Sequence, residues 1–271
     1  MNFNYIDLHI HAGIERPSPM AEWVDGLIRN GRTALGLVDH YELYLKSDED
    51  YASYLARKGF PRWYANGLEG FQAFCNEVRQ QAKREGVTVL LGLEVYHGDF
   101  PDVREDFLAG LDFIGCHISK TESFEPWGDF LLRSAEKLSF TAHENGLVGV
   151  LFHPFNHSFW SHRQGMTPPR GLNIIEPGKL DDFAESLAAL DVCVEINWGS
   201  DGKNLNQPEF IEKYVPVVRA LKSQGVLFWL GSDIHHSLSS VYDMNRMCAA
   251  LDISVNDIWM PESIRNKSQQ T

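Results

Sequence analysis

The sequence of 271 residues has few of the features that mark secreted, membrane-spanning or strongly basic proteins. It holds only four cysteines, and none of them forms a CxxC pair or a short disulfide-type spacing. Reduced, buried thiols are therefore expected, as in a cytoplasmic protein. No apolar run approaches the roughly 20 residues that span a bilayer, so no membrane association is expected. Residues 1–13 lack a basic segment followed by an apolar run, and no signal peptide is expected.

Positive charge is also scarce. The chain has 24 Lys and Arg against 37 Asp and Glu, which gives a formal net charge of −13. Proteins that bind nucleic acid or anionic membranes through their general surface charge are rich in Lys and Arg, so neither partner is expected here. A small phosphorylated substrate stays compatible with the charge, because bound metal ions can reverse the local sign.

Short apolar stretches alternate with amphipathic ones along almost the whole chain. The apolar stretches are rich in Val, Leu and Ile and are typical of parallel strands that are buried on both faces. Strands are predicted at residues 5–9, 33–38, 87–93, 111–116, 147–152, 192–196 and 226–230, with a further short one at 172–175. Helices are predicted at residues 20–30, 68–85, 103–108, 127–145, 180–190, 208–224 and 241–251. The alternation indicates an α/β protein.

Two long excursions interrupt this alternation, at about residues 41–66 and 155–171. Excursions of this length often shape or cover a binding site. No stretch reads as a linker, so residues 1–271 are expected to form a single domain. The strand pattern allows either a closed barrel or an open doubly wound sheet. Phosphate loops of the GxGxxG or GxxxxGK[ST] type are absent, which weakens the nucleotide-binding open sheet.

Six of the eleven histidines and two carboxylates lie where predicted strands end. His9 and His11 are two residues apart on one strand, so they project to the same face. Asp233 and His235 repeat this spacing after the last strand. The other strand ends carry His40, Glu94, His117 and His153. Imidazole and carboxylate are ligands of divalent metal ions, and barrel active sites lie at the carboxyl ends of strands, so this set predicts one metal centre.

Three more polar residues near strand ends have less distinctive positions. Glu195 and Asn197 end the sixth strand, where they either line the site or make ordinary strand-end hydrogen bonds. Asp39 precedes His40, and adjacent residues of a strand point to opposite faces. Asp39 is therefore expected to have a structural role or to support a ligand from behind.

Taken together, these motifs resemble those of the PHP (polymerase and histidinol phosphatase) family. The resemblance covers residues 5 to about 236, in the family's order of motifs. The matching motifs are His9-Ile10-His11, Asp39-His40, Gly92-Leu93-Glu94, His117, His153-Pro154 and Gly231-Ser232-Asp233-Ile234-His235. The resemblance implies a distorted (β/α)7 TIM-like barrel with two or three divalent metal ions (Zn, Mn or Fe) at its C-terminal face. It also implies metal-dependent hydrolysis of phosphate esters.

Carried over residue by residue, the resemblance implies three sets of metal ligands. The first set is His9, His11, Glu94 and Asp233. The second shares Glu94 and adds His117 and His153, and the third takes His40 and His235. Family members complete the third set with a His or Asp a few residues after the HxH pair. Glu15 is the only candidate for this position here, and its spacing is slightly short.

The function expected from these sets is that of a phosphatase or phosphoesterase. A metal-bound hydroxide would attack a small phosphate ester, with Glu94, Asp233 and His235 as catalytic residues. Either His235 or a metal-bound water would protonate the leaving oxygen. Lys120, Arg163 and Arg170 are candidates for binding the phosphate, although for any one of them an exposed surface cation is the simpler interpretation.

Two other functions are compatible with the same residues. An amidohydrolase-like enzyme that cleaves a C–N or C–O bond would also use HxH on the first strand and Asp on a late strand. The extra His40 and the lack of an evident strand-end lysine for carbamylation disfavour it. A non-catalytic metal-bearing module is the third possibility, and the nearly complete set of ligands disfavours it.

Overall fold

Seven parallel strands form the centre of the fold and lie side by side in the order in which they occur in the chain. The computed structural model describes residues 2–100, 103–117, 127–155, 177–238, 242–262 and 264–265. The strands are β1 (Ile6–His11), β2 (Ala34–Val38), β3 (Thr88–Tyr96), β4 (Phe113–His117), β5 (Val148–Leu151), β6 (Cys193–Asn197) and β7 (Phe228–Gly231).

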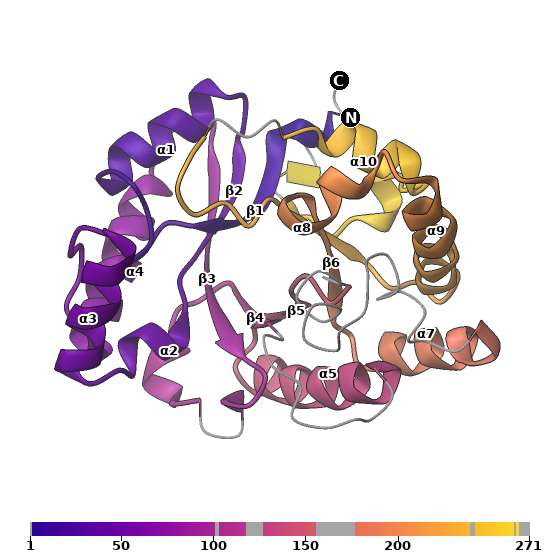
Figure 1. The fold of residues 1–271 in the computed structure, drawn as a ribbon, viewed down its shortest axis with the longest axis horizontal. Coiled ribbons are helices and arrows are strands. Elements are labelled where there is room, and N and C mark those ends of the chain that lie inside the picture. Colours follow the sequence, from indigo (N-terminus) through magenta and orange to yellow (C-terminus); the bar gives the residue numbers. More distant parts are fainter. Residues whose placement is uncertain are drawn as a thin grey trace.

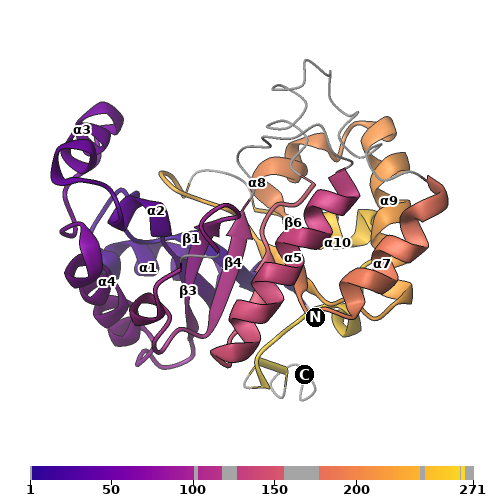
Figure 2. The same ribbon diagram turned by 90° about the horizontal axis from the view of Figure 1, so that it is seen from below.

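Helices surround the strands on the outside of this sheet, as Figure 1 shows. The α-helices are α1 (Met20–Arg29), α2 (Tyr41–Tyr44), α3 (Asp48–Lys58), α4 (Gly67–Gln81), α5 (Trp127–Glu144), α7 (Leu180–Ala188), α8 (Trp198–Asp201), α9 (Pro208–Ser223) and α10 (Met244–Ala250). Short 3-10 helices are η1 (Phe3–Tyr5), η3 (Glu105–Phe107), η5 (Pro177–Lys179), η6 (Gly202–Asn204) and η7 (Val255–Asp257). Helix α3 extends away from the other helices, which is clearest in Figure 2.

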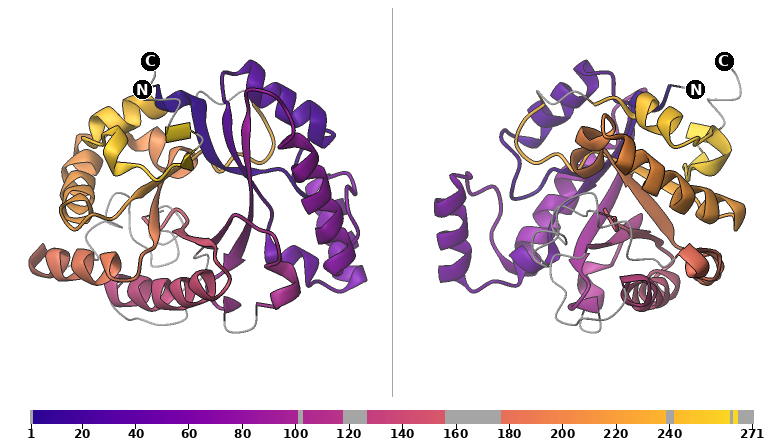
Figure 3. Two further views of the ribbon diagram at one scale, coloured as in Figure 1. Left: turned by 180° about the vertical axis from the view of Figure 1, so that it is seen from behind. Right: turned by 45° about the vertical axis from the view of Figure 1, so that its right-hand side comes forward.

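Contacts between the first and the last strand close the sheet into a barrel. The backbone N–H of His11 donates to the carbonyl of Ile234 at 3.0 Å, and that of Asp233 donates to the carbonyl of His9 at 2.8 Å. Within the two strands themselves, the indole N–H of Trp229 on β7 donates to the carbonyl of Leu8 on β1 at 2.9 Å. The two further views in Figure 3 show β1 beside the segment that leads out of β7. The sequence left a barrel and an open sheet as alternatives, and the TIM-like barrel is confirmed.

Aromatic side chains fill the interior beneath the carboxyl ends of the strands. Trp229, Phe113 and Phe152 are fully buried, and the rings of Trp229 and Phe113 lie 4.7 Å apart. Gly115 leaves the space for Phe152, since a Cβ at this position would lie 1.9 Å from the Phe152 ring. The Phe152 ring stacks on His9 at 3.9 Å. These aromatic side chains therefore form an apolar layer, called the aromatic floor below, under the strand-end histidines.

The structure corrects several predicted element boundaries. β1 continues to His11, so both histidines of the first motif belong to the strand. β3 extends to Tyr96, because it pairs with β4 from Gly92 onward, and Glu94 therefore lies within the strand rather than after it. The predicted helix at 103–108 is a single 3-10 turn, η3, as is common for a segment too short to offset the cost of starting an α-helix.

The first predicted excursion, residues 41–66, is not an irregular loop but contains α2 and α3. The second, residues 155–171, lies outside the described residues except for Phe155, as does the short strand predicted at 172–175. All four cysteines are buried and free. None of the helices in the described part of the chain is both long enough and apolar enough to cross a membrane.

Candidate metal centre

Side chains from the carboxyl ends of five neighbouring strands and from the segment after β7 meet over the aromatic floor. His9 and His11 project together from β1, and their Nε2 atoms lie 3.2 Å apart. Both imidazoles are fully buried. The Oδ1 atom of Asp233 lies 3.2 Å from His11 Nε2 and 3.7 Å from His9 Nε2. These three residues form one group whose atoms could hold a metal ion.

Glu94 lies at the centre of the cluster, within 4 Å of imidazole nitrogens from five histidines. Its Oε2 atom is 3.1 Å from His40 Nδ1, 3.2 Å from His11 Nε2 and 3.9 Å from His9 Nε2. Its Oε1 atom is 3.2 Å from His153 Nε2 and 3.8 Å from His117 Nδ1. Each carboxylate oxygen thus faces a different set of imidazoles, which is the arrangement that a carboxylate shared between two cations needs.

A second carboxylate, Glu15, faces the outer side of the same cluster. Its Oε2 atom lies 3.0 Å from His235 Nε2 and 3.7 Å from His40 Nε2. The hydroxyl of Tyr54 on α3 donates a short hydrogen bond to Glu15 Oε1. Glu15, His40 and His235, together with His11, form a group of four residues whose spacing suits a metal ion. The structure therefore brings Glu15 close to His40 and His235, although its spacing from the HxH pair in the sequence is slightly short.

His40 faces both sides of the cluster, which the sequence did not indicate. Its Nε2 points toward Glu15, while its Nδ1 points toward Glu94. Glu42, a residue that the sequence analysis overlooked, places Oε1 3.3 Å from His40 Nδ1 and 3.7 Å from His117 Nε2. The only sequence signal for Glu42 is its position two residues after His40, in the first turn of α2.

The histidines of the cluster fall into two groups by pKa. Burial disfavours the charged rings of His9 and His11, but nearby carboxylates outweigh it; they hold the pKa of His9 well above its usual range and raise that of His11 to about 10, so a metal ion binding there would displace a proton from each. Burial lowers the pKa of His40 to about 3 and that of His117 to about 4, so both imidazoles are neutral. Burial opposes ionisation of Glu94, but hydrogen bonds with His11 and His153 favour the carboxylate, and the pKa of Glu94 lies well below its usual range. Burial likewise opposes ionisation of Asp233, and His9 and His11 lower the pKa of that carboxyl. Ionised carboxylates and neutral imidazoles are the forms that bind metal ions.

Unsatisfied polar atoms provide an independent test of whether the residues fit a metal ion. In the part of the chain that the structure describes, His40 Nδ1, Glu94 Oε2 and His117 Nε2 are buried without a hydrogen-bond partner. Buried polar atoms without partners are costly in folded proteins. Cations coordinated by these atoms would remove the cost, so the donor set fits divalent metal ions.

Two members of the cluster have strained backbones. His153 and Asp233 have φ angles of +32° and +54°, in the left-handed region that few non-glycine residues adopt. Such strain is typical of functional sites, where the surrounding structure holds the residue in place. Asp39 supports the neighbouring backbone: its carboxylate accepts hydrogen bonds from the backbone N–H groups of Ile14 and His40 and from the hydroxyl of Tyr44.

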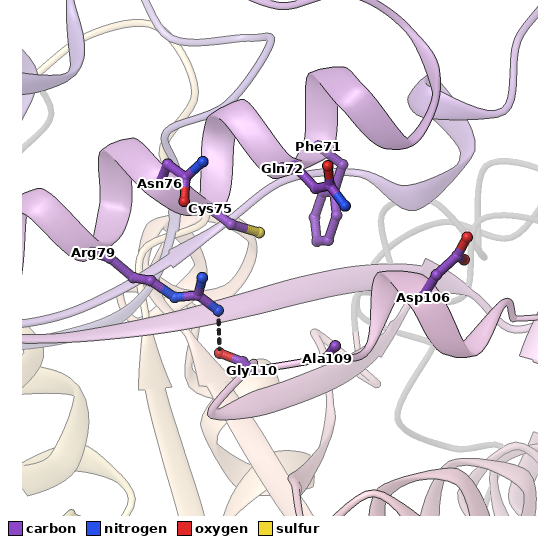
Figure 4. A pocket seen from close by; sticks show the side chains of 8 residues that line it. All are labelled: Phe71, Gln72, Cys75, Asn76, Arg79, Asp106, Ala109 and Gly110. Carbon is purple, nitrogen blue, oxygen red and sulfur yellow. Dashed lines mark hydrogen bonds between the residues drawn. The ribbon is translucent and has the colours of Figure 1, made fainter.

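The residues predicted to bind phosphate, Lys120, Arg163 and Arg170, lie outside the described residues. A separate cavity of about 440 Å³ lies on the outer side of the barrel, between α4 and the turn at Gly110. Figure 4 shows Arg79 across this cavity, where its guanidinium donates to the carbonyl of Gly110 at 3.3 Å. None of the candidate ligands lines it, so the cavity is distinct from the candidate metal centre.

Comparison with known proteins matches the chain at the level of the fold. No family model and no curated protein matches the sequence. Among solved structures, a histidinol phosphate phosphatase from Lactococcus lactis subsp. lactis Il1403 aligns over 92% of this chain and 93% of its own, with a TM-score of 0.56 and 12% identity. The two chains share one fold. That structure is a complex with Zn, L-histidinol and phosphate. The fold implied by the PHP resemblance is therefore confirmed.

Two other solved structures are more distant. An amidohydrolase from Burkholderia ambifaria with bound Zn covers 92% of this chain and 70% of its own, at 9% identity and a TM-score of 0.45. An adenine deaminase from Arthrobacter aurescens covers 94% of this chain and 77% of its own, at 15% identity and a TM-score of 0.41.

Proposed function

We propose that this protein hydrolyses a small phosphate ester at a centre of two or three divalent metal ions. The observation that carries the proposal is the position of Glu94, a buried carboxylate whose two oxygens face imidazoles from five histidines. The shared fold of the Lactococcus lactis phosphatase, a complex with Zn, L-histidinol and phosphate, supports the choice of a phosphate ester.

We divide the proposed ligands into three sets, which the distances support. The first is formed by His9, His11, Asp233 and Glu94 Oε2, and the second by Glu94 Oε1, His117 and His153. Glu15 and His235 form the third on the outer side, with His40 available to either the second or the third set. The bound ions would supply positive charge for the phosphoryl oxygens and would activate a water molecule as the nucleophile. Zn, Mn and Fe all suit a set of imidazoles and carboxylates.

Residues of the chain would then hold the substrate and move one proton. His235 is the most exposed residue of the three ligand sets, with a quarter of its side chain open to solvent, and so lies nearest to an entering substrate. Its Nδ1 lies 2.9 Å from the carbonyl oxygen of Asp233 and its Nε2 lies 3.0 Å from Glu15, so both nitrogens have acceptors when the ring is protonated. In a centre whose outer set holds no ion, we assign to His235 the donation of a proton to the leaving oxygen. Lys120, Arg163 and Arg170 stay candidates for holding the phosphate.

The test combines metal analysis with a panel of substrates. The purified protein is expected to contain two or three divalent ions per chain and to release inorganic phosphate from at least one phosphorylated metabolite. Glu94→Gln should lower metal content and abolish turnover, because an amide nitrogen cannot act as the second bridging ligand atom. The matched control is Glu85→Gln, an exposed carboxylate just before the other end of β3, which should leave both unchanged.

Hydrolysis of amides or lactones without any phosphate ester would replace the proposal with the amidohydrolase-like alternative. Less than one ion per chain after gentle purification would favour a non-catalytic module.

A further inference from the structure

One buried carboxylate beside the centre belongs to none of the ligand sets. Glu195 on β6 is completely buried and accepts three hydrogen bonds. Its Oε1 accepts from His9 Nδ1 at 2.8 Å. Its Oε2 accepts from the backbone N–H of His153 at 2.6 Å and from the side-chain amide of Asn197 at 3.1 Å. Both oxygens are thus engaged, and two of the three donors belong to candidate metal ligands.

The first of these bonds decides which nitrogen of His9 can bind a metal. An ionised carboxylate can only accept a hydrogen bond, so the proton of a neutral His9 lies on Nδ1. The lone pair is then on Nε2, the nitrogen that faces His11 and Asp233. In a water-filled site either tautomer of His9 would form. The contact with Glu195 removes that freedom, because it retains the proton on Nδ1 when a metal ion displaces the proton from Nε2.

The second bond holds His153 in its strained backbone conformation. The backbone N–H of His153 donates to Glu195 at a residue whose φ is +32°. From there the imidazole places Nε2 3.2 Å from Glu94 Oε1. Because the N–H has a charged acceptor, turning this backbone to an ordinary conformation would cost a strong buried hydrogen bond.

The surroundings of Glu195 keep it in place. The Asn197 side chain that donates to Glu195 also accepts from the backbone N–H of Ser200 at 2.8 Å, which ties it to the start of α8. On the other side, Gly231 leaves the space for the pair, since a Cβ there would lie 2.2 Å from Glu195 Oε1 and 2.5 Å from the Cβ of His9.

From this geometry we propose that Glu195 is a positioning residue that fixes the tautomer of His9 and the backbone of His153 together. The inference rests on the proposed metal centre. It requires a carboxylate and not merely a polar side chain of the same shape, because all three partners are donors. Glutamine offers one accepting oxygen, so its NH2 group would face either His9 Nδ1 or the donors of His153 and Asn197. In the first case His9 is driven to the wrong tautomer, and in the second His153 loses its acceptor.

The experiment measures zinc affinity and the tautomer of His9, without any ester. Glu195→Gln should weaken zinc binding about 10- to 100-fold in competition with a chelator, the usual cost of losing a partner that orients a ligand. Nitrogen-15 NMR of the ring should show the proton of His9 on Nδ1 in the zinc-loaded wild type and on Nε2 in the share of the zinc-treated variant in which the new amide faces His9. The matched control is Asp201→Asn, a buried carboxyl on α8 that accepts from Tyr214 and touches neither histidine. It should keep wild-type affinity and the Nδ1 tautomer.

Two results would overturn the inference. One is a folded Glu195→Gln variant with wild-type zinc affinity. The other is a zinc-loaded wild type in which His9 carries its proton on Nε2, a measurement that decides the matter even if the variant does not fold. Because both readouts use zinc alone, a protein that binds zinc through this arrangement but hydrolyses no phosphate ester would refute the proposed function and leave the role of Glu195 supported.

Discussion

Replacing Gly231 by alanine tests the packing that holds Glu195 against His9. The added Cβ would lie 2.2 Å from Glu195 Oε1 and 2.5 Å from the Cβ of His9, whereas non-bonded carbon atoms settle at about 3.5–4 Å. The two side chains must therefore move by roughly 1 Å or more. Such a shift breaks the 2.8 Å hydrogen bond between them, because neither can retreat into the packed interior.

The magnitude follows from two losses. Overpacking a tight interior costs about 1–3 kcal/mol, and a buried hydrogen bond to a charged group contributes about 1.5–3 kcal/mol. The free energy of unfolding should thus fall by roughly 3–5 kcal/mol. At a urea dependence of about 3 kcal/mol per M, the unfolding midpoint moves down by roughly 1–2 M. Zinc affinity should fall as well, since His9 loses the partner that orients it.

The assay is equilibrium unfolding in urea, followed by zinc titration under native conditions. Gly178→Ala is the matched control, because a Cβ at Gly178 would meet no atom of the described residues within 4 Å and φ there is not positive. Its free energy of unfolding should stay within about 0.5 kcal/mol of that of the wild type. A Gly231→Ala variant as stable as this control, with unchanged zinc affinity, would show that the contact between Glu195 and His9 is not tightly packed.

Three further outcomes are expected. Burial raises the pKa of Asp201 from 3.8 to about 7, so the folded state holds its proton more tightly than the unfolded state. As the pH rises from about 4 to 7, this carboxyl should lower the free energy of unfolding by up to roughly 4 kcal/mol. Urea unfolding at several pH values should show that Asp201→Asn removes this contribution. Tyr54→Phe removes the hydroxyl bonded to Glu15 and should weaken binding of the outermost ion alone, so that metal analysis at limiting zinc finds one ion fewer per chain. The control is Tyr5→Phe at an exposed tyrosine, which should leave the number of bound ions unchanged. Removal of metal by a chelator should lower the melting temperature by roughly 10 °C if zinc is present at about 1,000 times its dissociation constant, and an unchanged melting temperature would contradict a metal centre in the folded protein.

The strand ends could be predicted from sequence because two simple rules locate them. Buried parallel strands are short apolar runs, and side chains two residues apart share a face. His9 with His11 and Asp233 with His235 follow directly from these rules. Glu94 needed only the end of the apolar run at Leu93, although β3 in fact continues to Tyr96 by pairing with β4.

Other parts of the centre depend on contacts that no local pattern reveals. Glu15 reaches His235 because the loop after β1 turns back over the barrel, and Tyr54 meets it from α3, 39 positions away. Whether Glu195 lines the site or makes strand-end hydrogen bonds could not be decided from its position. Glu195 does both, because its two oxygens accept hydrogen bonds from the imidazole of His9 on β1 and from the backbone N–H of His153 after β5, which are 186 and 42 positions away.

The seam that closes the barrel has a consequence for synthesis. The backbone N–H of Ser232 donates to Asp7 Oδ1 across 225 positions of the chain, and Trp229 reaches Leu8 across 221. Contacts between residues this far apart form late and slow folding. While the chain is emerging from the ribosome, β1 therefore has an open edge, and His9 and His11 have no Asp233 opposite them. The first and third ligand sets, which need Asp233 and His235, can therefore be completed only after the seventh strand has docked.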